Sequence, residues 1–223
     1  MTTAALPRWD MTPIYPSLDS PEFADGFAAA RAAVDALRVL FDAEGIDQQV
    51  PHALDDATVA RAERVIPQYN AVLAQAHTLE AYIRSFVATD SRDALAQARQ
   101  SEWEQVGLVL RQLGTRFAGW VGSLDVAALV ARSPVAADHA YALEKAQIQA
   151  RHLMSPAEEA LAAELNITGG AAWSKLYGNI ASQIMVPIEL EGQQQELPMS
   201  DVRNLALSPD RAVRQGGFEA EIA

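Results

Sequence analysis

Cysteine is absent from this sequence of 223 residues, and no run of 18 uninterrupted apolar residues occurs in it. Without cysteine the chain forms no disulfide, no thiolate zinc site and no cysteine nucleophile. The apolar runs are too short for a membrane-spanning helix. The first ten residues lack the basic start and apolar core of a signal peptide. We therefore expect a cytoplasmic protein that does not enter a membrane.

Basic residues are also scarce: there are 17, of which 15 are arginine, against 29 acidic residues, and the net charge is −12. A surface that follows nucleic-acid phosphates needs clustered Lys and Arg. Here the basic residues are scattered among acids, so we expect neither nucleic acid nor an anionic membrane as a partner. A solvated acidic surface that aids solubility explains the charge. An acidic wall for cationic peptides is the alternative that charge alone leaves open.

Four Ser-Pro dipeptides mark predicted helix starts, and each precedes an apolar run with helical spacing. They begin at Ser20, Ser133, Ser155 and Ser208. A serine side chain accepts a hydrogen bond from the first helical turn, and proline at the first helical position loses no hydrogen bond there. Glu158, three residues after Ser155, completes a capping box. The alanine-rich composition also favours helix.

Two long helical patterns predict an antiparallel hairpin. The first covers about residues 58–88, with Pro67 expected to kink or split it. The second follows the turn at 89–91 and carries an apolar stripe at alternating steps of three and four. The stripe consists of Trp103, Val106, Leu110, Leu113, Phe117, Trp120 and Leu124. Aromatic residues at this spacing are more often core, and a peptide-binding face is the alternative.

The remaining patterns complete a mainly α fold, with a multi-helix body and one small β-hairpin near 185–198. The sequence predicts helices over about 20–43, 134–151, 156–166 and 171–184, with Gly169-Gly170 separating the last two. Alternating apolar residues at 186, 188 and 190 and the turn at Glu191-Gly192 predict the hairpin. Trp9 is expected to anchor an extended arm that precedes the first helix.

Candidate metal ligands are few. The four histidines are His52, His77, His139 and His152, and none lies in a His-Glu-x-x-His motif. The best pair is His77 with Glu80, which share one face of a helix. A zinc site needs three or four ligands in a defined geometry. We therefore predict no metal site and no cofactor in these residues.

The candidate nucleophiles and acid–base pairs also do not meet the requirements of a catalytic site. Gly122-Ser123 lacks the second glycine of a Gly-x-Ser-x-Gly turn. The acid pairs Asp55-Asp56 and Glu158-Glu159 lie at predicted helix starts, where the helix dipole favours negative charge. We predict no catalytic residue, and the substrate-binding residues are not identified. Tyr82 and Tyr141 are semi-polar candidates for the border of a cleft.

Two stretches carry a resemblance to a known family. They are LMSPAEEALAAELNITGGAAWSKLY at Leu153–Tyr177 and LSPDRAVR at 207–214. Both resemble the N-terminal half of oligoendopeptidase F-type enzymes, which belong to the M3 (thimet oligopeptidase-like) family of zinc metallopeptidases. Weaker similarity covers Trp9, Ile14-Tyr15 and Leu18-Asp19-Ser20, and then Ala81-Tyr82 and Thr89-Asp90-Ser91.

The resemblance implies that residues 1–223 are a helical domain truncated before the zinc catalytic domain. It divides into an arm (1–19), a helical body (20–184), a hairpin and connector (185–207) and the start of an incomplete helix (208–223). In the family this half forms one wall of a channel for short peptides. Zinc and its ligands belong to the missing C-terminal half, so the fragment alone is expected to be inactive. The alternatives are a non-catalytic peptide- or protein-interaction module and a structural helical hairpin that oligomerises.

Overall fold

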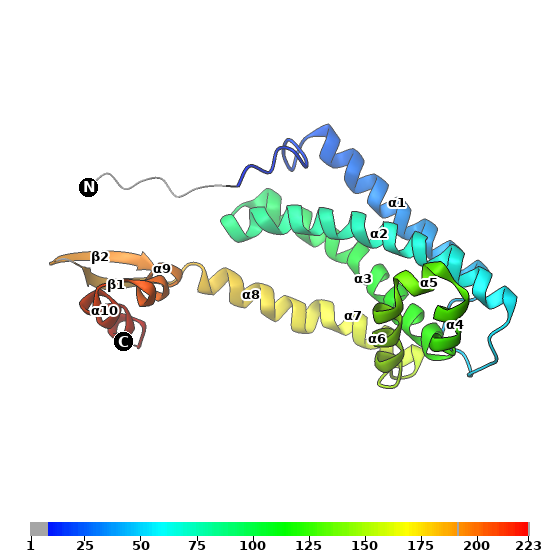
Figure 1. Ribbon diagram of the computed structural model, residues 1–223. Coiled ribbons are helices and arrows are strands. Elements are labelled where there is room, and N and C mark those ends of the chain that lie inside the picture. Colours follow the sequence, from blue (N-terminus) through cyan, green and yellow to red (C-terminus); the bar gives the residue numbers. More distant parts are fainter. Residues whose placement is uncertain (1–8, 191, 223) are drawn as a thin grey trace. The chain divides into compact units, whose positions relative to one another are not determined.

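The structure is a computed structural model that describes residues 9–190 and 192–222 (Figure 1). The chain forms two compact units, Met1–Leu165 and Asn166–Ala223. Helices make up most of both units, and the described residues contain one sheet of two antiparallel strands. The predicted fold class, mainly α, is therefore confirmed. No helix in the described ranges combines the length and apolar character that crossing a membrane requires.

The first unit is built on three long helices with shorter helices added after them. Its elements are α1 (Pro21–Glu44), α2 (Asp56–Thr89), α3 (Ala94–Gly122), α4 (Val126–Arg132), α5 (Pro134–Asp138), α6 (Ala140–Ala150) and α7 (Pro156–Asn166). Helices α2 and α3 form the predicted antiparallel hairpin, and α1 packs against both (Figure 1). Helix α6 packs against α3.

Three of the four Ser-Pro helix starts are confirmed. Ser20 Oγ accepts a hydrogen bond from the Phe23 N–H at 3.2 Å, and Ser133 Oγ accepts one from the Ala136 N–H at 3.2 Å. At Ser155 the capping box forms, since the Glu158 carboxylate accepts from the Ser155 N–H at 3.0 Å. The Ser155 hydroxyl also donates to this carboxylate at 2.7 Å, and the side-chain and backbone hydrogen bonds from Ser155 together lower the pKa of Glu158.

The fourth start is shifted by two residues. Helix α10 (Arg211–Ile222) begins after Asp210, whose carboxylate accepts from the Ala212 N–H at 2.8 Å. Ser208 Oγ instead accepts from the Asp210 N–H at 3.2 Å, within the preceding turn. A carboxylate interacts with the positive end of the helix dipole more strongly than a neutral hydroxyl does, so aspartate takes the cap position.

The predicted anchor at Trp9 is wrong, because 92% of this side chain is exposed. Tyr15 holds the segment before α1 instead. Its ring lies edge-on to Phe23 at 5.6 Å and to Tyr82 at 5.1 Å, and Tyr82 Oη donates to the Tyr15 carbonyl at 2.9 Å. Gly26 makes room for this ring, since a Cβ there would lie 2.5 Å from Tyr15 Oη.

Helix α2 continues through Pro67 and is not split there. Val65 and Ile66, immediately before the proline, are buried in the core. Tertiary burial of this kind offsets the loss of one backbone hydrogen bond.

The predicted helix over 134–151 is interrupted at His139, which separates α5 from α6. His139 Nδ1 donates to the Val135 carbonyl at 2.7 Å. In a continuous helix, the Val135 carbonyl would accept from the backbone N–H of His139. Here that backbone N–H donates to the Ala136 carbonyl instead. Helix α4 has no counterpart among the predicted helices, and it begins where the Asp125 carboxylate accepts a hydrogen bond from the Ala128 N–H.

The second unit contains the β-hairpin and two helices that cover it. Its elements are the π-helical turn η1 (Ile167–Ala171), α8 (Ala172–Ala181), β1 (Met185–Leu190), β2 (Gln193–Pro198), α9 (Met199–Asn204), the 3-10 turn η2 (Leu205–Leu207) and α10. The predicted hairpin near 185–198 forms, and its strands pair from Met185 with Pro198 to Leu190 with Gln193. Val186 and Ile188 are buried beneath the helices. Helix α8 ends three residues before the predicted boundary at 184.

The two glycines of α10 have different environments, which predicts opposite effects of alanine. A Cβ at Gly217 would lie 2.9 Å from Leu205 Cβ and 3.2 Å from the Val202 carbonyl oxygen, whereas nothing lies within 4 Å at Gly216. Gly216→Ala should stabilise α10 by up to about 1 kcal/mol through helix propensity. Gly217→Ala should destabilise it by about 1–2 kcal/mol through overpacking. Hydrogen exchange over 211–222 measures the stability of α10 in both variants. Equal protection in the two variants would contradict the different environments of Gly216 and Gly217.

Candidate functional site

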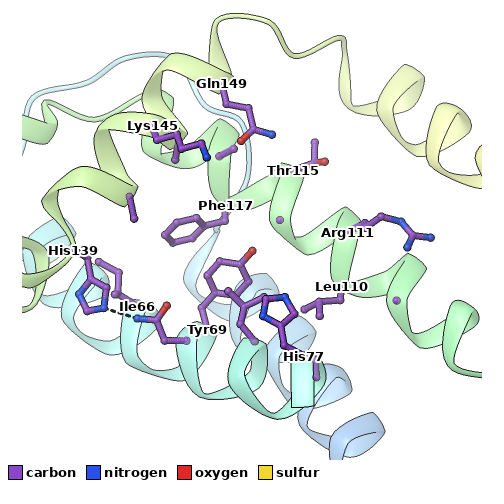
Figure 2. Close-up of a pocket in the computed structure, with 18 of the residues that line it drawn as sticks. Ile66, Tyr69, His77, Leu110, Arg111, Thr115, Phe117, His139, Lys145 and Gln149 are labelled. Atoms are coloured by element: carbon purple, nitrogen blue, oxygen red, sulfur yellow. Dashed lines mark hydrogen bonds between the residues drawn. The ribbon is translucent and has the colours of Figure 1, made fainter. Parts of the chain in front are cut away.

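A groove of about 640 Å³ lies in the first unit between α2, α3 and the segment from His139 through α6 (Figure 2). Helix α2 contributes Ile66, Tyr69, Asn70, Leu73, Ala76, His77 and Glu80; α3 contributes Trp103, Gly107, Leu110, Arg111, Gly114, Thr115, Phe117 and Ala118; the third wall contributes His139, Ala142, Leu143, Lys145, Ala146 and Gln149. The volume is in the range that accommodates a drug-sized ligand.

The floor of the groove is apolar and aromatic. The rings of Tyr69 and Phe117 lie side by side, with centroids 4.8 Å apart (Figure 2). The Tyr69 hydroxyl makes no hydrogen bond within the described residues. A Cβ at Gly114 would lie 3.2 Å from this hydroxyl, so glycine at 114 leaves it room. Burial raises the pKa of Tyr69, so the hydroxyl stays protonated at neutral pH and can donate a hydrogen bond.

The Asn70 side-chain amide is a polar group with a fixed orientation on the α2 wall of the groove. Asn70 Nδ2 lies 2.6 Å from His139 Nε2, and His139 Nδ1 lies 2.7 Å from the Val135 carbonyl oxygen. The carbonyl can only accept, so we assign the proton to Nδ1 and a neutral imidazole to His139. His139 then accepts from Asn70. This orients the Asn70 amide, whose oxygen and second N–H have no partner among the described residues.

Cations outnumber acids in the groove, in contrast to the chain as a whole. Arg111 and Lys145 line it, and neither forms an ion pair within the described parts of the chain. Glu80, on α2, is the single carboxylate among the described lining residues. Thr115 lies one turn after Arg111 on α3, and Gln149 lies one turn after Lys145 on α6. Each wall therefore presents a cation and a hydrogen-bonding side chain on the same helix face.

The predicted metal candidates do not assemble into a ligand set. His77 and Glu80 both line the groove, but His77 is exposed. His139 is held by its two hydrogen bonds, and His52 Nδ1 lies 3.3 Å from the Val50 carbonyl oxygen. Across residues 9–190 and 192–222, no three His, Asp or Glu side chains lie together in a group that could hold a metal ion. The expectation of a metal-free chain stays a prediction.

The aromatic stripe of α3 serves both the core and the groove. Trp103, Val106, Leu113, Trp120 and Leu124 are buried. Leu110 and Phe117 are half-buried and face the groove, which Trp103 also borders. The two tyrosines proposed for a cleft border do not line it: Tyr82 is fully buried and Tyr141 is 78% exposed.

The other candidates have structural roles. Asp55 caps α2 by accepting from the Thr58 N–H at 2.7 Å, and its hydrogen bonds with Thr58 lower the pKa of Asp55. Ser123 is buried, and its hydroxyl donates to the Trp120 carbonyl at 2.6 Å. A buried hydroxyl with this bond is not a nucleophile for a substrate. The groove can therefore bind and orient a ligand, and no catalytic group has been identified in it.

Fold and site together define a mainly helical protein with a ligand-sized groove. Residues 124–184 match the family model of the M3 peptidase N-terminal region, described as Oligopeptidase F. This match confirms the predicted resemblance to the N-terminal region of M3-type oligoendopeptidases, and it covers α4 to α8. No curated protein and no solved structure gave a match.

Proposed function

We propose that this chain is the N-terminal, channel-forming part of a zinc-dependent oligoendopeptidase that hydrolyses short peptides. The observation that carries the proposal is the family match over residues 124–184. The groove between α2, α3 and α6 supports it, because an apolar floor with a few fixed polar groups suits a short peptide. The cytoplasm is the proposed location, consistent with a sequence that contains no cysteine.

The residues of this chain do not fit the zinc that the family implies. Its histidines are dispersed, and no ligand group of three forms among the described residues. In the proposed enzyme, zinc and the general base are supplied by a further stretch of polypeptide that carries the His-Glu-x-x-His motif. The contribution of this chain is to admit and orient the peptide.

Within the described part of the second unit, no element covers the apolar face of α8, and such a face suits contact with a partner stretch. Trp173 and Tyr177 are each 70% exposed, and Ile180, one turn further, is 56% exposed. No residue of α8 is buried. A ten-residue helix without a packed face is marginal in water, so we propose that the zinc-bearing half covers it. A non-catalytic peptide-binding module is the second candidate, which the groove also favours.

An assay of the chain alone and with its proposed partner tests the function. The 223-residue chain with added zinc should not cleave a fluorogenic peptide library. When it is joined to the reading frame that encodes the zinc motif, chelator-sensitive cleavage should appear. Cleavage by the chain alone would contradict the division of roles. Absence of cleavage in a folded, zinc-loaded assembly would favour the non-catalytic module.

A further inference from the structure

We propose that the groove between α2, α3 and α6 binds the carboxyl-terminal end of a peptide. The terminal apolar side chain packs on the aromatic floor, and the terminal carboxylate lies between α3 and α6. The inference rests on the proposed function in taking a peptide as the ligand. It adds a location on this chain and a preference for a free carboxyl terminus.

The charge on the neighbouring helices α3 and α6 carries the first step. Arg111 on α3 and Lys145 on α6 line the groove, and no described carboxylate pairs with either. In a chain of net charge −12, a groove with two free cations and one acid attracts a negative group. Glu80 belongs to α2, the opposite wall. A carboxylate is therefore favoured at the α3–α6 side and disfavoured at α2.

Hydrogen-bonding groups accompany both cations. Thr115 lies four residues after Arg111, and Gln149 lies four residues after Lys145, so each pair shares one helix face. Figure 2 shows the Lys145 ammonium and the Gln149 amide extending from the same side of α6. The Thr115 hydroxyl and the Gln149 amide can donate to carboxylate oxygens that Lys145 attracts. A carboxylate has two oxygens that accept several such bonds. The Arg111 guanidinium extends toward Gly107, away from α6, and adds positive charge at longer range (Figure 2).

The floor and the fixed amide define the rest of the ligand. Tyr69, Leu110 and Phe117 provide a surface for an apolar or aromatic side chain. The Asn70 amide is oriented by His139 and retains one acceptor and one donor. A peptide bond offers the complementary donor and acceptor. A ligand with an apolar side chain, a peptide bond and a carboxylate matches all three features.

Isothermal titration of the whole chain with two tripeptides tests the carboxylate preference. The probes are N-acetyl-Ala-Ala-Phe with a free carboxyl terminus and the same peptide as its terminal amide. We expect the acid to bind about tenfold more tightly than the amide, a difference of about 1.4 kcal/mol in binding free energy. The difference should shrink at high salt, because screening weakens the charge interaction. Equal affinity of the two peptides at low salt would overturn the proposal.

A matched pair of variants assigns the preference to the groove. Lys145→Gln should remove most of the tenfold difference. Arg84→Gln removes the same charge from an exposed position on α2 that does not line the groove, and the difference should persist. The same loss in both variants would mean that only the net charge matters, which would overturn the assignment.

A third variant, Gly107→Leu, tests where the peptide binds, because the leucine side chain would fill part of the groove. Gly107 lines the groove, and a Cβ there would meet only the end of the Arg111 side chain, at 3.4 Å. Gly107→Leu should abolish binding of the acid peptide while the melting temperature stays the same or rises, because leucine favours helix more than glycine. Undiminished binding would place the peptide elsewhere.

Failure of this inference can be told apart from failure of the proposed function. An assembled enzyme that cleaves peptides, with no carboxylate preference in the chain, would overturn only the groove assignment. A zinc-loaded assembly without cleavage would overturn the peptidase role whatever peptide the groove binds.

Discussion

Phe41→Ala is expected to lower the free energy of unfolding of the first unit by about 3–5 kcal/mol, the range for removing a buried aromatic ring. Phe41 is 0% exposed. Its ring lies 5.8 Å from the Tyr69 ring and 6.4 Å from the Phe117 ring, so it joins α1 to α2 and α3. The Arg116 guanidinium also lies 5.8 Å from its centroid. Truncation to alanine leaves a cavity beside all three partners.

Val39→Ala provides the matched control on the same helix. Val39 is 62% exposed, and a surface substitution of this kind changes stability by about 0.5 kcal/mol or less. Urea unfolding followed by circular dichroism measures both variants, and a shift of the midpoint at unchanged slope identifies a change in stability. Similar midpoints for the two variants would show that Phe41 is not in the core.

The Phe41 variant also has an expected effect on the groove. Tyr69 and Phe117 line the groove, and Phe41 packs behind both rings. Without this support the rings can shift into the cavity, so peptide affinity should fall even where the variant is still folded. The core and the candidate site are therefore coupled through two aromatic side chains.

Local signals in the sequence were sufficient to predict most helices. Ser20 and Ser155 begin helices as predicted, because capping depends on residues within one turn. The hairpin at 185–198 follows from alternation and from Gly192, whose φ of 78° suits the turn. These features need no information about distant parts of the chain.

The errors arose where a tertiary contact decides between local alternatives. Trp9 is the larger aromatic residue, but the space left by Gly26 admits Tyr15, 67 residues before its hydrogen-bond partner Tyr82. The break at His139 depends on its side chain bonding Val135, which helical periodicity does not reveal. Pro67 remains inside α2 because its neighbours are buried. Sequence spacing alone does not contain these contacts.

The groove was only partly predictable for the same reason. The apolar spacing on α3 predicts Leu110 and Phe117 on one face, and the spacing of His77 and Glu80 places that pair on one face of α2. Asn70 and Lys145 could not be predicted as lining residues, because they reach one groove only when α6 packs against α3 and His139 contacts Asn70 of α2. One signal was present: Gly107 and Gly114 lie two turns apart on one face of α3, where a helix normally favours larger residues.

Gly122→Ala is expected to destabilise the first unit by about 2–3 kcal/mol, although alanine favours helix more than glycine. A Cβ at position 122 would lie 2.3 Å from Ala150 Cβ. Carbon atoms in contact are normally about 3.5–4.0 Å apart, and both Cβ atoms are fixed to their backbones, so no rotamer relieves the overlap. Helices α3 and α6 must therefore move apart.

Ala150→Gly in the same chain should restore most of the lost stability, because it removes the opposing Cβ. Residue 150 ends α6, so glycine there costs less than in a helix interior. The coupling energy from the double-mutant cycle should be at least about 1 kcal/mol, well above the error expected for independent sites. Separation of α3 from α6 would also move Lys145 and Gln149 away from Arg111 and Thr115, so carboxylate preference should fall in Gly122→Ala and return in the double variant. Additive stability changes would show that Gly122 and Ala150 are not in contact, and the close approach that forms this wall of the groove would then be wrong.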